Sequence, residues 1–251
     1  MFPAAHVSEP GTGFILGQRF GAGTRLLVQH SRNTYARLFA HCGVDWATAC
    51  ARALTYRPVI EALDPALMRE IEGLAEGSGL QVAEVLALNC RTEILPPGFL
   101  GDTDIEARQA LEANRAAGLP DWLEGSKPDP AIELGECTAM GVGPQASENR
   151  QTWLAQNWDW LGRQRQALGL LKTPGPHGYT ITTLTEAGML AKIGLNEAGF
   201  ALGLNILRSV DDGARPGVPV HVLLRHLLDC SSLNEARAAL AHAATLGFGA
   251  G

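Results

Sequence analysis

The spacing of apolar residues predicts a helical region in the first third of the chain. From Ser31 to about Leu88, apolar side chains recur at helical spacing. Within this region Asp64-Pro65 is typical of a helix start, because an N-cap aspartate precedes proline at the first helical position. A shorter helix is expected from Gln81 to Leu88. Residues 11–30 carry glycines and one short apolar alternation, which predicts a strand and a turn.

The middle of the chain lacks a regular pattern. Residues 96–135 are rich in proline, glycine, alanine and charged residues. This composition is typical of an exposed connector. We expect one helix within it, from about Thr103 to Ala117.

After the connector the apolar period changes from helical to strand-like. Residues 179–184 alternate and are rich in β-branched side chains, and two similar tetrads follow, Thr185–Gly188 and Asn196–Gly199. The tetrads predict successive hairpin turns in an antiparallel meander, with strands at 189–195 and 200–207.

Two helices are expected after the meander. The first runs from about Val218 to Leu228, and the second begins at Ser232, where Ser232-x-x-Glu235 forms a capping box. Strands and helices in this order predict an α+β fold, in which the later helices can cover one face of the sheet.

Two further strand-like stretches, Gly135–Val142 and Leu154–Trp160, flank a polar turn. If this hairpin folds about Glu148, it places Cys137 directly opposite Asp159, because 137 + 159 = 2 × 148. In that register the two side chains lie on one face, roughly 4.5–5.5 Å apart at Cβ. A slip of one residue would separate them.

Composition and charge narrow the classes of function. The 251 residues are 46% hydrophobic and 18% charged, as in ordinary globular proteins. The net charge of −6 gives no basic surface for nucleic acid or anionic membranes. No apolar run reaches the ~20 residues that cross a bilayer, and the N-terminal sequence lacks the features of a signal peptide. We therefore expect neither a nucleic-acid nor a membrane partner.

The five cysteines are scattered and odd in number, which favours reduced thiols and a cytoplasmic location. Unpaired cysteines usually pack in the core. We assign that role to four of them: Cys42, Cys50, Cys90 and Cys230. Cys137 differs, because it follows the connector, begins a strand and faces a carboxylate in the simplest register.

Asp159 lies between Trp158 and Trp160 in the sequence. A carboxylate buried between two indoles is costly without a cationic or hydrogen-bonding partner. An α-ammonium group on residue 137 would be such a partner, which points to cleavage of the bond between Glu136 and Cys137. The alternative is structural, with both tryptophans in the core and Asp159 capping a turn.

The chemistry of a cysteine at a new N-terminus is coherent. The thiol of Cys137 would attack the carbonyl of Glu136 and form a thioester, which water resolves. The freed α-amine has an unperturbed pKa near 8, so it can then act as base for its own thiol. Asp159 would orient this amine. Asn205 is a candidate for oxyanion stabilisation, together with backbone N–H groups.

Other motifs give weaker signals. Residues 11–17 have the wrong spacing for a dinucleotide-binding fingerprint, and we interpret them as a turn. His221 and His226 point about 140° apart on a helix, which is a poor zinc site. We expect no metal and no cofactor. Arg91 and Glu93 could form an ion pair that shapes the site, or a purely structural one.

Cys137-Thr138 followed by Gln156-Asn157-Trp158-Asp159-Trp160 resembles the acyl-coenzyme A:6-aminopenicillanate acyltransferase-type family of N-terminal nucleophile hydrolases. Related bile-salt and penicillin V hydrolases tend to carry arginine where this chain has Gln156, which favours the acyltransferase-type branch. Further stretches that resemble the family are Asn89–Glu93, Gly194–Gly199, Gly203–Asn205 and Gly217–Val220.

The resemblance implies an αββα sandwich with a helical prosegment, made as a precursor and self-cleaved between Glu136 and Cys137. It implies that Cys137 is the nucleophile, that Asp159 orients its amine and that Asn205 contributes to the oxyanion hole. Four further residues would shape the site: Asn157, Trp158, Arg91 and Glu93.

We therefore expect a largely helical prosegment or α fragment at residues 1–136 and the first part of a catalytic β fragment at 137–251. Family members usually continue further, so we expect that C-terminal strands are missing, and that the protein's own C-terminal region or cleaved fragment is a partner. The predicted function is that of a self-processing cysteine amidohydrolase or acyltransferase for small amides, such as N-acyl amines or N-acyl amino acids. Two alternatives stay open: an inactive binding or scaffold protein of the same fold, and a redox or regulatory thiol at Cys137.

Overall fold

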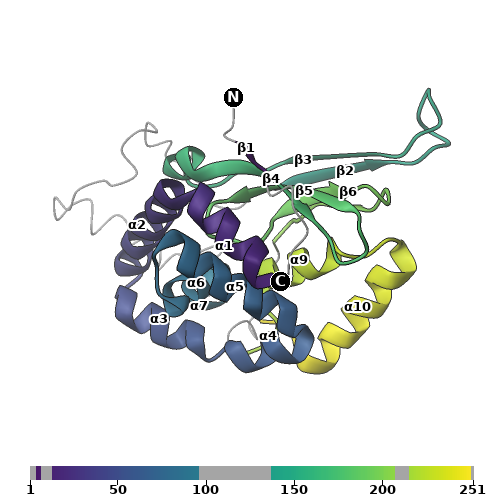
Figure 1. Ribbon diagram of the computed structural model, residues 1–251. Helices are drawn as coiled ribbons and strands as arrows, with labels where there is room; N and C mark the ends of the chain where they lie inside the picture. Colours follow the sequence, from purple (N-terminus) through teal and green to yellow (C-terminus); the bar gives the residue numbers. More distant parts are fainter. Residues whose placement is uncertain (1–3, 7–12, 96–136, 207–214, 250–251) are drawn as a thin grey trace, which may run out of the picture.

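The fold of the described residues is α+β, as predicted. Figure 1 shows the helices on one side of a five-stranded sheet, with a two-stranded hairpin over its other side. Within the described part of the chain, no helix has both the length and the apolar composition needed to span a membrane. The predicted connector and its helix, like Glu136, lie outside that part. The computed structural model describes residues 4–6, 13–95, 137–206 and 215–249.

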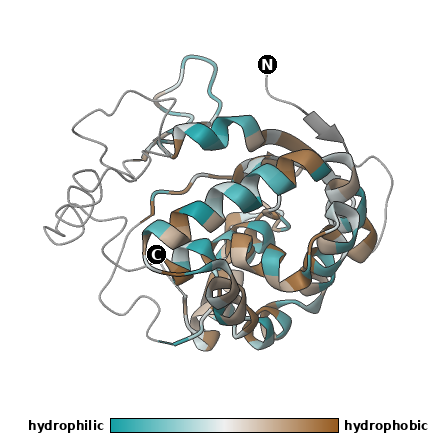
Figure 2. Ribbon diagram, turned by 90° about the vertical axis from the view of Figure 1, so that its left-hand side faces the viewer, coloured by the Kyte–Doolittle hydropathy of each residue, from teal (hydrophilic) through white to brown (hydrophobic). Residues whose placement is uncertain are grey.

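The helical layer comes from the N-terminal part of the chain, which confirms the helical pattern predicted for residues 31–88. Along these helices hydrophilic and hydrophobic positions are mixed, as expected for helices with one face against a core (Figure 2). The helices are α1 (Gly13–Gly23), α2 (Arg25–His41), α3 (Trp46–Leu54), α4 (Arg57–Leu63), α5 (Pro65–Ser78), α6 (Val82–Asn89) and α7 (Arg91–Ile94).

Helix α5 begins as its sequence predicts. The Asp64 carboxylate accepts the Ala66 N–H at 2.9 Å, and Pro65 occupies the first helical position. The helix ends at Gly79, which adopts a left-handed conformation with φ of 75°. Leu74 and other apolar residues of its inner face are fully buried. Local caps and an apolar stripe therefore define this helix.

The strand and turn predicted for residues 11–30 are wrong, because the chain is helical from Gly13 onward. Glycines recur every four residues on α1 and face glycines of α5. A Cβ on Gly17 would overlap the carbonyl oxygen of Glu70, and one on Gly73 would overlap that of Phe14. The missing side chains thus let two helix backbones approach closely, and the glycines form a helix–helix contact.

The main sheet has the strand order β1-β4-β5-β6-β7. Its last three strands form the predicted antiparallel meander, although β6 and β7 are shorter than expected. A 3₁₀ helix at Gly162–Ala167 precedes β4. The strands are β1 (Ala4–His6), β4 (Leu168–Pro174), β5 (Thr180–Glu186), β6 (Ile193–Asn196) and β7 (Ala201–Leu202).

The residues just before β6 bond to side chains instead of extending the backbone pairing with β5, which explains why β6 is short. The buried Asn89 donates from Nδ2 to the carbonyl of Gly188 at 2.9 Å. Its Oδ1 accepts the Leu190 N–H at 3.0 Å. These bonds hold the segment that leads to Lys192 against the end of α6.

The predicted hairpin forms, but with a different register. Thr138 pairs with Asn157, so the paired numbers sum to 295 (138 + 157) instead of the predicted 296. Cys137 is therefore not opposite Asp159: it precedes the first paired residue, and Asp159 lies beyond the second strand. The hairpin strands are β2 (Thr138–Val142) and β3 (Trp153–Asn157).

The turn of the hairpin accounts for this shift. The Ser147 hydroxyl donates to the Gln151 carbonyl at 2.6 Å. Asn149 Oδ1 accepts the Gln151 N–H at 3.2 Å, and Arg150 takes a positive φ of 56°. These bonds centre the loop between Ser147 and Glu148 rather than on Glu148 itself. The strand pairing therefore moves by one position.

The two C-terminal helices are confirmed as α9 (Val220–Leu227) and α10 (Leu233–Leu246). Ser232 Oγ accepts the Glu235 N–H at 3.2 Å, while the Glu235 carboxylate accepts the N–H of Ser231, one residue earlier than in a capping box. The described residues thus supply one helical layer and two sheets. They contain no second helical layer, so the αββα sandwich stays a prediction.

The substitution Gly17→Ala should destabilise the fold, because its methyl group would overlap the Glu70 carbonyl. Overpacking of this kind costs about 1–3 kcal/mol. Gly23→Ala at the end of the same helix is the matched control, since no atom of the described residues lies within 4 Å of its added Cβ. Urea unfolding of both variants measures the difference; equal stabilities would contradict the close approach of α1 and α5.

Candidate active site

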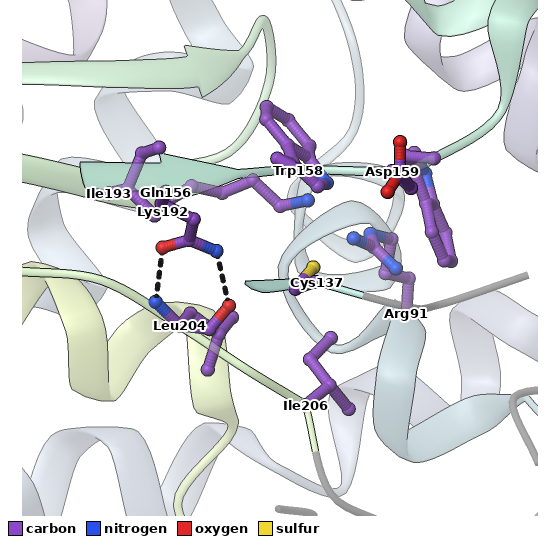
Figure 3. Close-up of a pocket in the computed structure, with 10 residues that line it drawn as sticks. Arg91, Cys137, Gln156, Trp158, Asp159, Lys192, Ile193, Leu204 and Ile206 are labelled. Carbon is purple, nitrogen blue, oxygen red and sulfur yellow. Dashed lines mark hydrogen bonds between the residues drawn. The ribbon is translucent and has the colours of Figure 1, made fainter. Parts of the chain in front are cut away.

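A pocket lies where the hairpin, the main sheet and α7 meet. In Figure 3 the side chains of Arg91 and Lys192 point toward Cys137 from two sides. The structure therefore brings Cys137 and Asp159 to one pocket although they are not paired across the hairpin. The lining residues are Arg91, Cys137, Gln156, Trp158, Asp159, Trp160, Lys192, Ile193, Leu204 and Ile206.

Cys137 is half-buried at the pocket, immediately before β2. The other cysteines contact the hydrophobic core, as predicted. Burial raises the pKa of Cys42 to about 12 and that of Cys50 to about 11, and it also raises the pKa values of Cys90 and Cys230. The described residues contain no group of three or more His, Cys, Asp and Glu side chains that could hold a metal ion.

The side chain of Asp159 is exposed, and its Oδ2 accepts a hydrogen bond from Asn157 Nδ2 at 2.6 Å. The expectation that this carboxylate is buried between two indoles is therefore wrong. Solvent and the Asn157 amide already compensate the charge of this exposed carboxylate. Its position therefore does not require an ammonium partner. Its presence in the pocket with Cys137 is the observation that keeps it a site candidate.

The two indoles next to Asp159 face cations. Lys192 Nζ lies 3.6 Å from the ring centroid of Trp158, and Arg91 Cζ lies 4.2 Å from that of Trp160. The Trp160 Nε1–H also donates to the Tyr35 hydroxyl at 2.8 Å. Cation–π contacts in a desolvated site are stabilising, so both rings help to hold the cations at the pocket.

Glu186, at the end of β5, is the buried anion beneath these cations. Its carboxylate accepts a hydrogen bond from the hydroxyl of Tyr35 and forms an ion pair with Lys192 Nζ at 2.9 Å. Arg91 lies 3.5 Å away. Burial by itself would raise the pKa of Glu186, but the charges of Lys192 and Arg91 outweigh it and lower the pKa.

Lys192 is 3% exposed, and burial lowers the pKa of its amine to about 7. Repulsion from Arg91 acts in the same direction, whereas attraction to Glu186 and Cys137 opposes it. A buried amine next to a second cation favours its neutral form. Lys192 therefore changes its charge near neutral pH, at a position facing the pocket.

Arg91 and Glu93 contact different partners in the structure. Among the described residues, the carboxylate paired with Arg91 belongs to Glu186, so an Arg91–Glu93 pair is not formed. Glu93 accepts the Val220 N–H at 2.8 Å, at the start of α9. Arg91 lines the pocket, whereas Glu93 lies outside its lining.

Gln156 ties the pocket to the segment after β7. Its Nε2 donates to the Leu204 carbonyl, and its Oε1 accepts the Leu204 N–H at 2.7 Å (Figure 3). Both neighbours of Asn205 line the pocket, but Asn205 is exposed and does not. Asn157 does not line it either, and contacts the site through Asp159.

Comparison with known proteins relates the region around these residues to one family. Residues 146–247 match the model of the acyl-coenzyme A:6-aminopenicillanic acid acyl-transferase family. The acyl-coenzyme A:6-aminopenicillanic-acid-acyltransferase 40 kDa form of Emericella nidulans is 30% identical over 173 residues. The match with the Emericella protein covers 68% of this chain and 38% of the relative, so the chain spans well under half of the relative's length.

The resemblance inferred from short motifs is thus confirmed. The range matched by the acyl-transferase family contains Asp159, Lys192 and Asn205, whereas Arg91 and Cys137 precede it. The pocket is therefore assembled from residues inside and outside the matched range.

Sequence reasoning missed Lys192, Glu186 and Tyr35. Lys192 had a recognisable signal, because it is the single charged residue in the run from Met189 to Ile193. A lysine in an apolar segment has either an exposed head group or a buried partner. Glu186 was interpreted as a turn residue because a glycine follows two positions later.

Replacing Glu186 with glutamine should destabilise the fold strongly. It would leave Arg91 buried without its carboxylate, and breaking a buried ion pair costs about 3–5 kcal/mol. Glu61→Gln is the matched control, because the Arg57–Glu61 pair is exposed and such pairs contribute about 0–1 kcal/mol. Urea unfolding at neutral pH compares the stabilities of the two variants. Similar small losses of unfolding free energy would show that Glu186 does not compensate the charges of Arg91 and Lys192.

Proposed function

We propose that this protein is a self-processing cysteine amidohydrolase or acyltransferase that acts through a thioester on Cys137. The observation that most supports the proposal is the shared pocket. Cys137 and Asp159, two residues that the sequence motifs single out, line it together in a chain related to acyl-transferases. Nothing in the described structure favours the scaffold or the redox alternative.

Self-cleavage would divide the chain into fragments 1–136 and 137–251. The Cys137 sulfur attacks the carbonyl carbon of Glu136, the peptide C–N bond breaks, and the acyl group passes from nitrogen to sulfur. Water then hydrolyses this thioester, releasing a carboxylate at residue 136 and regenerating the thiol. Glu136 lies outside the described residues, so the position of the cleaved bond rests on the sequence motif.

Turnover would use the same sulfur with a different base. The α-amine released at residue 137 takes the thiol proton, since its unperturbed pKa is near 8. Asp159, in the same pocket, orients that amine through its carboxylate. Backbone N–H groups stabilise the oxyanion, and Asn205 stays a candidate because the residues on either side of it line the pocket.

The proposed substrate is a small amide or another small acyl donor, such as an N-acyl amine or N-acyl amino acid. Ile193, Leu204 and Ile206 give the pocket apolar walls, which suit an apolar acyl group. The Emericella relative is named as an acyltransferase of acyl-coenzyme A and 6-aminopenicillanic acid. For this chain we propose the same reaction class, with transfer of the acyl group to water or to an amine.

Cys137→Ala should abolish both self-cleavage and thioester formation, because alanine has no nucleophilic atom. Intact-mass analysis would find one uncut chain, and incubation with a panel of N-acyl amines would give no acylated protein. Cys50→Ala, at a half-buried cysteine in α3, is the control and should behave as the parent. Cleavage at residue 136 in Cys137→Ala would remove Cys137 as the nucleophile.

Asp159→Asn should leave the fold intact and slow turnover about 100-fold or more, the scale of a lost acid–base or orienting group. The side chain is exposed, so its loss should not alter the unfolding transition. Asp45→Asn is the control, since Asp45 caps α3 and asparagine also caps helices well. The measurement is the rate of product release by the cleaved protein. A rate within about threefold of the parent's would exclude Asp159 from the site, because that loss is too small for a catalytic group.

A further inference from the structure

The proposed function leaves one proton transfer without an acceptor. In an uncleaved chain the nitrogen of residue 137 is a peptide nitrogen, which donates a hydrogen bond and is not a base. The α-amine that serves turnover does not yet exist at this stage. Self-cleavage therefore needs another group to take the Cys137 proton.

Lys192 is the side chain in the pocket that is suited to this transfer. It lines the same pocket as Cys137, and its amine extends toward the sulfur from the segment before β6 (Figure 3). We propose that Lys192 accepts the thiol proton of Cys137 during self-cleavage, a role that rests on the proposed function. It differs from the base of turnover, so the two stages have different proton acceptors.

The position of Lys192 is fixed from three directions. Asn89 holds the backbone at Gly188 and Leu190. Glu186 forms an ion pair with the amine at 2.9 Å, and the ring centroid of Trp158 lies 3.6 Å from Nζ. A side chain held in this way keeps its amine at the pocket without loss of alignment, which proton transfer requires.

The charges around Lys192 allow it to act as a base near neutral pH. Burial and repulsion from Arg91 lower its pKa to about 7, so the amine is largely neutral above that pH. Burial keeps the nearby His221 neutral, because it lowers the pKa of that imidazole. The titratable groups that interact with Lys192 are Glu186, Arg91, His221 and Cys137. Asp159 lines the same pocket, and Tyr35 bonds to Glu186.

The proton balance closes without any further reactant except water. The neutral amine of Lys192 takes the proton from sulfur, and the thiolate adds to the carbonyl carbon at residue 136. As the C–N bond breaks, the Lys192 ammonium returns the proton to the departing nitrogen of residue 137. Glu186 and Trp158 stabilise the ammonium while it exists.

The test is Lys192→Arg in the full chain. Arginine keeps a positive charge facing Glu186, but it cannot be deprotonated at accessible pH. Self-cleavage should slow about 100-fold or more, the usual contribution of a general base. Lys172→Arg on β4 is the matched control, because Lys172 is exposed and away from the pocket, and its cleavage rate should equal the parent's.

The pH dependence of parent cleavage provides a second reading that needs no variant. The rate should rise as Lys192 loses its proton, through a pKa of about 7, and then level off. Two results would overturn the inference. One is a cleavage rate that keeps rising above pH 9. The other is a Lys192→Arg protein whose cleavage rate is within about threefold of the parent's, because a general base contributes far more than that. Either result leaves Cys137 as the nucleophile. Absence of cleavage in the parent would instead overturn the proposed function, and the inference with it.

Discussion

The buried carboxylate of Glu186 is the interaction on which the arrangement of the pocket depends. A charge removed from water is destabilising unless hydrogen bonds and opposite charges compensate it. The compensating groups come from three places: Tyr35 on α2, Arg91 on α7 and Lys192 before β6. Because one carboxylate links all three, the helical layer and the sheet are fixed relative to each other where the pocket lies.

This arrangement also bears on the proposed cleavage. Tyr35 and Arg91 precede residue 137, whereas Cys137, Glu186 and Lys192 belong to the later part. The two parts also share one hydrophobic core, and β1 pairs with β4 of the main sheet. Breaking the bond before Cys137 would therefore cut the chain without separating the groups that make the site. Both parts would be needed for activity.

The sequence predicted the elements whose causes are local. Helix α5 was predictable from Asp64 and Pro65, and the meander from its two tetrads. The contact between α1 and α5 was not, because a glycine indicates a turn or a close packing contact with equal ease until its neighbour is known. The hairpin register failed for a related reason. It depends on hydrogen bonds within the turn, such as that of Ser147, which residue types alone do not specify.

The site was predictable where its residues form a contiguous motif, and not where the fold brings distant charges together. Glu186 is ordinary in its own segment, and Lys192 stands out only as a single charge in an apolar run. Neither segment indicates that the two residues meet beside Arg91. Among the described residues, the nitrogen atoms of the Arg91 guanidinium are buried without hydrogen-bond partners, and its ion pair with Glu186 is 3.5 Å long. Such a group lowers stability, since unpaired buried donors carry a desolvation penalty. Local costs of this kind are typical of functional sites, and here the cost falls in the pocket that holds Cys137.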